Sequence, residues 1–153
     1  MNGHLRRNNV KQWLGLAFIA SLFLLNGCAT TPQSDGIHRV VIQVSTDDPR
    51  AQTIALNNAI NLQRKYGVDH VQVEIVAYGP GISLVLPTGQ HARRVKNLAQ
   101  HDEFKFSADQ HTLDKIRQRT GRIPRLIDGV GTVPMGVARV VELQEQGYSY
   151  IRP

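Results

Sequence analysis

Apolar and polar positions along the chain form runs with two different periods. Residues 38 to 45 are rich in β-branched side chains and predict a buried strand. Asp48 and Pro49 follow as the N-cap and first residue of a predicted helix, and Gly67 is placed to end it. Inside that helix the apolar residues recur at helical spacing, at Ala55, Leu56, Ala59, Ile60, Leu62 and Tyr66.

The same alternation continues to the end of the chain. The further elements that we expect are a strand at 71–78, a helix at 90–100, a strand at 104–108, a helix at 112–119, a strand at 123–130, a helix opened by Pro134 and closed by Gly147, and an edge strand at 148–151. Strands and helices that alternate with short connections predict a three-layer α/β/α fold around a mainly parallel five-stranded sheet.

Polar and glycine residues follow the predicted strands. In parallel sheets, ligands bind outside the carboxyl ends of the strands, where helix N-termini also point. The glycine-rich turn at 79–81 has neither the P-loop nor the dinucleotide-binding spacing, so it does not predict a nucleotide site. The candidate ligand-binding residues in these loops are Ser45, Asp47, Gly79, Gly81, Asp109, His111 and Thr132.

Asp109 and His111 are open to two interpretations. Histidine side chains titrate near neutrality and a carboxylate can orient them, so the pair would suit proton chemistry. The simpler interpretation is capping, in which Asp109 accepts backbone N–H groups at the start of the next helix. We favour capping and assign no catalytic residue. Together with Asp47 and Asp48 the pair could surround a metal, but no ligand spacing is diagnostic, so we expect no metal and no cofactor.

A different pattern occupies the start of the chain. Arg6, Arg7 and Lys11 precede an uninterrupted apolar run from 13 to 25. Such a run is short for a bilayer span, which takes about 20 residues. A basic segment followed by a short apolar run is typical of a secretory signal peptide. The signal leads to Cys28, which is the only cysteine in the sequence.

The residues that end at this cysteine read Leu-Asn-Gly-Cys and resemble the lipobox of bacterial lipoproteins. The resemblance implies a signal peptide at 1–27, cleavage before Cys28, and diacylglyceryl attachment to its sulfur. Residues 28–37 would form a lipidated tether to a domain at 38–153. Ala29 in place of aspartate resembles an outer-membrane address. We therefore expect a bacterial cell-envelope protein, held to the membrane by the lipid on Cys28 and facing the periplasm.

Removal of the signal peptide lowers the formal net charge from +6 to +3. The remaining chain has no basic stripe with interleaved aromatic residues, so we expect no nucleic-acid partner. Two basic clusters lie at 91–96 and 117–125. Solvated helix faces explain them most simply, and contact with anionic lipid headgroups is the alternative.

Four segments of the domain share one family's sequence pattern. They read Ala-Leu-Asn-Asn-Ala at 55–59, Val-Ala-Tyr-Gly-Pro-Gly at 76–81, Gly-Val-x-Thr-Val-Pro-x-Gly-Val at 129–137, and Leu-Gln-x-x-Gly-Tyr-x-Tyr-Ile-x-Pro at 143–153. In this order they resemble the DsrE/DsrF-like family of the sulfur-relay type. The resemblance implies a five-stranded parallel sheet in three layers and frequent assembly into homo-oligomers.

Many members of this family carry a reactive cysteine in a loop that reads Ala-Cys-x-Asn-Thr-Leu. Here the corresponding residues are 108–113, with Asp109 at the cysteine position and His111 at the asparagine position. A persulfide needs a nucleophilic thiolate, which a carboxylate cannot replace. The sulfur of Cys28 would be occupied by lipid. The sequence therefore argues against persulfide transfer.

Three classes of function remain open at the level of the sequence. We favour a module that binds a small ligand or an envelope protein over an enzyme. The alternative is an accessory enzyme of sulfur-compound metabolism that uses Asp109 and His111 in proton chemistry. The third is a structural homo-oligomer whose family pocket is filled.

Overall fold

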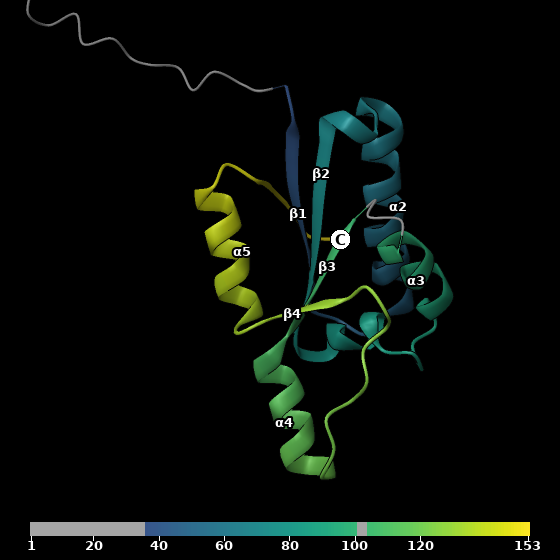
Figure 1. The fold of residues 1–153 in the computed structure, drawn as a ribbon, viewed down its shortest axis with the longest axis vertical. Coiled ribbons are helices and arrows are strands. Elements are labelled where there is room, and N and C mark those ends of the chain that lie inside the picture. The colour runs from purple at the N-terminus through teal and green to yellow at the C-terminus, as the bar shows by residue number, and fades with distance from the viewer. Residues whose placement is uncertain (1–35, 101–103) are drawn as a thin grey trace, which may run out of the picture. The chain divides into compact units, whose positions relative to one another are not determined.

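The computed structural model describes residues 36–100 and 104–153 (Figure 1). In chain order the elements are β1 (His38–Val44), α2 (Pro49–Tyr66), the 3-10 turn η2 (Val68–His70), β2 (Val71–Ala77), the 3-10 helix η3 (Gly79–Val85), α3 (Ala92–Gln100), β3 (Lys105–Asp109), α4 (Gln110–Thr120), β4 (Gly131–Val133), α5 (Gly136–Glu145) and β5 (Ser149–Ile151). The predicted signal peptide, the lipidation site Cys28 and most of the predicted tether lie outside the described residues.

The five strands form one sheet in the order β4-β3-β2-β1-β5, and every neighbouring pair is parallel. The predicted three-layer α/β fold with a parallel sheet is therefore confirmed. The helix that begins at Pro49 has the expected cap, because Asp48 Oδ1 accepts the backbone N–H of Arg50 at 2.8 Å. The C-terminal strand lies at the edge of the sheet, as its alternating pattern predicted.

The predicted strand at 123–130 is wrong. The fourth strand is the shorter segment Gly131–Val133, and the preceding residues form a connection outside the sheet. Ile127 is buried, and its backbone N–H donates to the carbonyl of Val85 at 3.0 Å instead of to a strand. The apolar residues of this segment therefore belong to a loop that packs on the core. The 3-10 helix after β2 was also not predicted, since only its first turn carried a glycine signal.

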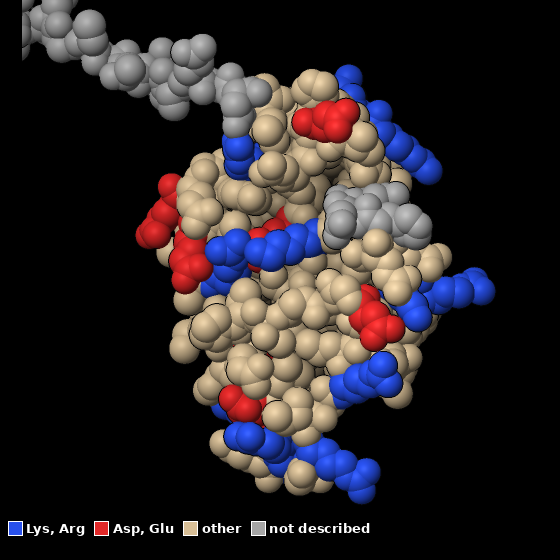
Figure 2. All heavy atoms as spheres, viewed as in Figure 1, with Lys and Arg blue, Asp and Glu red and all other residues tan. Residues whose placement is uncertain are grey.

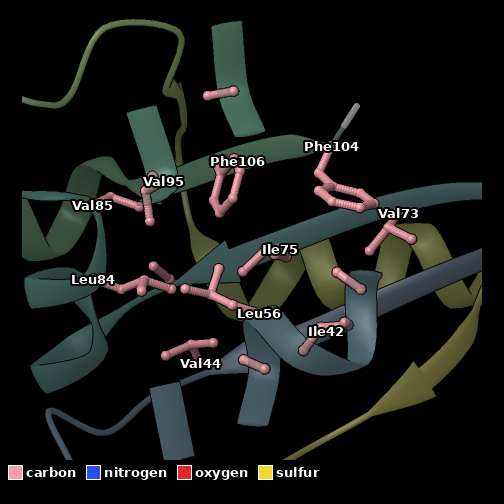
Figure 3. Packing of buried hydrophobic residues seen from close by; sticks show 14 of the residues in the cluster. Ile42, Val44, Leu56, Val73, Ile75, Leu84, Val85, Val95, Phe104 and Phe106 are labelled. Carbon is pink, nitrogen blue, oxygen red and sulfur yellow. The ribbon is translucent and has the colours of Figure 1, made fainter. Parts of the chain in front are cut away.

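The sheet separates two apolar clusters of unequal size. In Figure 1, α2 and α3 lie on one side of the sheet and α5 lies on the other. The larger cluster fills the space between the sheet and the α2 side, with Leu56 of α2 packed near Ile42 and Ile75 (Figure 3). Leu113 of α4 also belongs to this cluster. Burial of these side chains removes apolar surface from water and is the main stabilising contribution to the fold.

The opposite face of the sheet is covered by α5 and has a smaller apolar cluster. Val140 and Leu143 of this helix pack on Val41 of β1 and Val76 of β2. The buried polar residues Glu74 and Ser107 also lie on this face, where Glu74 contacts Arg139 of α5. No helix within residues 36–100 and 104–153 combines the length and the apolar character that a bilayer crossing requires.

Candidate functional site

An open groove of about 630 Å³ lies between the turn that follows β2 and one side of α4. This volume falls within the range of about 300–1,000 Å³ that is usual for small-molecule sites. The residues that line it are Gly79, Pro80, Ile82, His111, Thr112, Lys115, Ile116, Gln118 and Arg119. The groove lies where the carboxyl end of a central strand meets the first turns of a helix, as ligand sites in parallel sheets do.

The turn and the helix are joined by a direct hydrogen bond. The backbone N–H of Gly79 donates to Thr112 Oγ1 at 2.9 Å. That hydroxyl in turn donates to Asp109 Oδ2 at 2.6 Å. The chain of two bonds fixes the start of α4 against the end of β2, so the groove is a built feature of the fold.

The helical wall of the groove carries three basic residues at regular spacing. His111, Lys115 and Arg119 follow one another at intervals of four residues, which places them on one side of α4. All three are exposed. Lys and Arg side chains project from the region of α4 at the lower end of the view in Figure 2.

Among residues 36–100 and 104–153, no carboxylate lines this groove. Within the described part of the chain, neither Lys115 nor Arg119 forms an ion pair. Arg117, which lies between these two residues in the sequence, differs from them. It pairs with Asp114 at 3.5 Å and does not line the groove. The groove therefore has a positive wall that attracts negative charge.

Asp109 is a buried cap whose carboxylate is fully engaged. It is 5% exposed and accepts hydrogen bonds from four donors. Two come from the backbone of His111 and Thr112, one from the Thr112 hydroxyl, and one from the backbone N–H of Gly136 at 3.1 Å. The residue thus holds the N-terminus of α4 as predicted, and it also ties down the start of α5.

The other predicted loop residues do not converge on the groove. Ser45 lines a separate hollow of about 40 Å³ between the ends of β1 and β5, and Asp47 is exposed. Gly81 is buried against the carbonyl of Val44. Thr132 lies within β4 because that strand begins later than predicted. The structure therefore brings Gly79 and His111 together in the groove and buries Asp109 against its residue Thr112, whereas Ser45, Asp47, Gly81 and Thr132 do not line it.

Lys115, Arg119 and the apolar residues of the groove were not among the predicted site residues. The signal for the two basic residues is the four-residue interval that begins at His111, which marks one side of a helix. The interval alone could not identify a site, because solvated helix faces have the same pattern. Among residues 36–100 and 104–153, no group of three or more histidine, cysteine, aspartate or glutamate side chains is placed to hold a metal ion.

Comparisons with known proteins support the fold and give no function. No protein-family model and no curated protein gives a significant match to the chain. Among solved structures, it is similar to MTH1491, a protein of unknown function from Methanobacterium thermoautotrophicum. The two share 28% sequence identity at a TM-score of 0.67, over 76% of this chain and 99% of the other. The α/β architecture therefore recurs in a protein whose own activity is unassigned.

Proposed function

We propose that this chain is a lipid-anchored, periplasm-facing DsrE/DsrF-like domain that binds a small ligand in the groove beside α4 and does not transfer persulfide. The observation that carries this proposal is the groove itself, which has the size of a ligand site and an unneutralised basic wall. The only cysteine of the sequence is Cys28, so the domain that forms the groove contains no thiol. Binding therefore fits its chemistry better than sulfur transfer.

The sulfur-relay accessory enzyme remains the alternative function, with proton chemistry by Asp109 and His111. The geometry gives it less support than it gives to binding. The contact from Asp109 to His111 goes to the backbone N–H and not to the imidazole ring. A general base must reach the proton that it removes, and the carboxylate is buried with four donors around it.

Assembly into homo-oligomers is a second proposal, which a different part of the surface supports. Met135, Val137 and Val141 lie at the start and along the outer side of α5, and each is about half exposed. Exposed apolar side chains that cluster in this way are typical of protein–protein contacts. A second copy of the chain is the partner that the family resemblance implies.

The native mass of the full chain, extracted from bacterial membranes in mild detergent, tests the anchor and the ligand together. We expect a mature protein that begins at Cys28 and carries lipid, with an additional small mass that dissociates on activation. The matched control is Cys28→Ala, which should lose the lipid and the membrane association. Unlipidated Cys28 in the wild type would contradict the anchor. Ligand binding would be contradicted if the native protein retains no small mass and if no added small molecule shifts the amide signals of the groove residues.

A further inference from the structure

From the groove beside α4 we infer a ligand class: a small organic anion with an apolar body. This inference rests on the proposed function, because it names the chemistry of a ligand at the same site. The negative group would lie at Lys115 and Arg119, and the apolar part would lie on the surface formed by Pro80 and Ile116.

Selectivity for negative charge follows from the composition of the wall. The basic residues lie one helical turn apart, with a rise of about 6 Å from each to the next. Lys115 and Arg119 are not ion-paired within the described residues, and no carboxylate lines the groove. A cationic ligand would meet like charge there, and a neutral ligand could accept hydrogen bonds but would lack the charge attraction. An anion gains charge-assisted hydrogen bonds from both side chains.

The need for an apolar body follows from the floor of the groove. Ile116 is half-buried and packs against the main apolar cluster, so part of its side chain remains accessible in the groove, whereas Ile82 is only 5% exposed and adds little accessible surface. Pro80 adds a further apolar surface on the side of the turn. A bare inorganic anion would leave these surfaces in contact with water, whereas a ring or a short chain would cover them. The volume of about 630 Å³ has room for both parts of such a ligand.

A second basic hollow of about 350 Å³ provides a contrast within the same molecule. Arg93, Lys96 and Arg125 line it, together with Asp128. Asp128 pairs with Lys96 and with Arg125, each at 3.5 Å, so two of the three cations of this hollow already have a carboxylate partner. In the part of the chain that the structure describes, Lys115 and Arg119 of the groove beside α4 have no such partner, and for this reason we assign the anion to this groove.

The anion could be a free metabolite or the headgroup region of an anionic lipid, and a matched set of probes distinguishes these sources. The mature lipidated protein is placed in nanodiscs of zwitterionic lipid. Cyclohexanecarboxylate, cyclohexanecarboxamide, cyclohexylmethylammonium and inorganic sulfate are titrated by calorimetry and by amide chemical-shift mapping. We expect the carboxylate to shift the amides of Gly79, Thr112 and Ile116, and to bind at least about fivefold tighter than the carboxamide. The ammonium compound and sulfate should bind more weakly than the carboxylate.

Variants of a single helix supply the controls. Lys115→Gln and Arg119→Gln should each lower the affinity for the carboxylate about three- to tenfold and leave the affinity for the carboxamide unchanged. Arg117→Gln removes the same charge from a position outside the groove and should change neither affinity. If the ligand is a membrane lipid, nanodiscs with phosphatidylglycerol should compete with the carboxylate in the wild type. If it is a free anion, they should not.

Three outcomes would overturn the inference. Equal binding of carboxylate and carboxamide in the groove would reject anion selectivity and leave the proposed function in place. If Arg117→Gln and Lys115→Gln lower the affinity for the carboxylate equally, its binding depends on diffuse surface charge and not on the groove. If no probe shifts the groove amides and no retained mass is found in the native protein, the inference and the proposed function fail together.

Discussion

The guanidinium of Arg139 forms two hydrogen bonds with the carboxylate of Glu74, from Nε to Oε1 at 2.9 Å and from Nη2 to Oε2 at 2.8 Å. Glu74 belongs to the central strand β2 and is only 2% exposed, and Arg139 belongs to α5. Ser107 donates to the same carboxylate at 2.7 Å, and the amine of Lys105 lies 3.2 Å from it. A polar network therefore fastens α5 to a face of the sheet where its apolar cluster is small.

Removal of one member of this pair should destabilise the domain more than removal of both. We expect Arg139→Met to lower the free energy of unfolding by about 3 kcal/mol, because it leaves a buried carboxylate without its main partner. The double variant Glu74→Met/Arg139→Met should lower the free energy of unfolding much less, since replacing both members of a buried ion pair by apolar residues often leaves stability nearly unchanged. Urea unfolding of both variants measures this difference.

The control for the pair is Glu142→Gln, which removes the exposed partner of Arg139 at 3.4 Å. A surface ion pair contributes about 0–1 kcal/mol, so this variant should remain close to the wild type. A single Arg139→Met variant as stable as the double variant would show that the network does not hold α5.

Glu74 also predicts how stability depends on pH. Burial raises the pKa of this carboxyl group, but the hydrogen bonds from Arg139, Ser107 and Lys105 together outweigh it and hold the pKa below its ordinary value of 4.5. The stabilisation is therefore complete above the unfolded-state pKa of 4.5 and is lost as the pH falls through the lower native value.

Comparison with Glu74→Gln isolates this contribution from those of the other acids. At about pH 7 the wild type should be the more stable protein by urea unfolding. The difference between the two free energies should stay constant down to the ordinary carboxyl pKa and narrow at lower pH. A difference that widens on acidification would mean that the pKa of Glu74 is raised in the folded protein.

Local signals explain which parts of the fold could be predicted from the sequence. Asp48 and Asp109 were identified as caps because their spacing to the following residues determines which N–H groups they reach. Ile127 misled the prediction of a strand, since apolar residues of a packed loop and of a short strand look alike. Glu74 gave no signal at all, because its partner Arg139 is distant along the chain.

The candidate site was predictable to a similar extent. Gly79 and His111 could be placed near each other, because both follow neighbouring parallel strands. Lys115 and Arg119 could not, since the sequence does not say whether a basic helix side faces a hollow or open water. Ser45 and Thr132 were placed by the same rule as Gly79. The late start of β4 moved Thr132 from a loop into a strand.

The capping role of Asp109 predicts a stability effect for Asp109→Ala. Loss of its four hydrogen bonds should lower the free energy of unfolding by about 2 kcal/mol, near the upper end of the range for N-caps. Asp109→Asn keeps one acceptor oxygen and should lower the free energy of unfolding less than Asp109→Ala does. Thermal unfolding followed by circular dichroism compares the two. An Asp109→Ala protein as stable as the wild type would contradict the capping role.

Gly81 should not tolerate a side chain. A Cβ atom at this position would lie 2.1 Å from the carbonyl oxygen of Val44, at the point where η3 crosses the end of β1. We expect Gly81→Ala to destabilise the domain by about 1–3 kcal/mol, as overpacked sites do. Gly131→Ala is the matched control, since its Cβ would meet nothing closer than 3.8 Å. Equal unfolding free energies for the two variants would show that the backbone at Gly81 can move away.

The outer side of α5 predicts how the protein assembles. Val137 and Val141 are 52% and 49% exposed and lie one helical turn apart, so they form a continuous apolar strip. If two copies bury this strip against each other, Val141→Lys places a charge in the contact and should convert the oligomer into a monomer. Sedimentation velocity of the detergent-solubilised protein measures the change in its oligomeric state.

The control variant Gln146→Lys adds the same charge at an exposed position just beyond the helix and should leave the oligomer intact. Because lysine is well tolerated on exposed helix surfaces, neither variant should unfold the domain. A wild-type protein that sediments as a monomer, or an oligomer indifferent to Val141→Lys, would remove this strip from the interface.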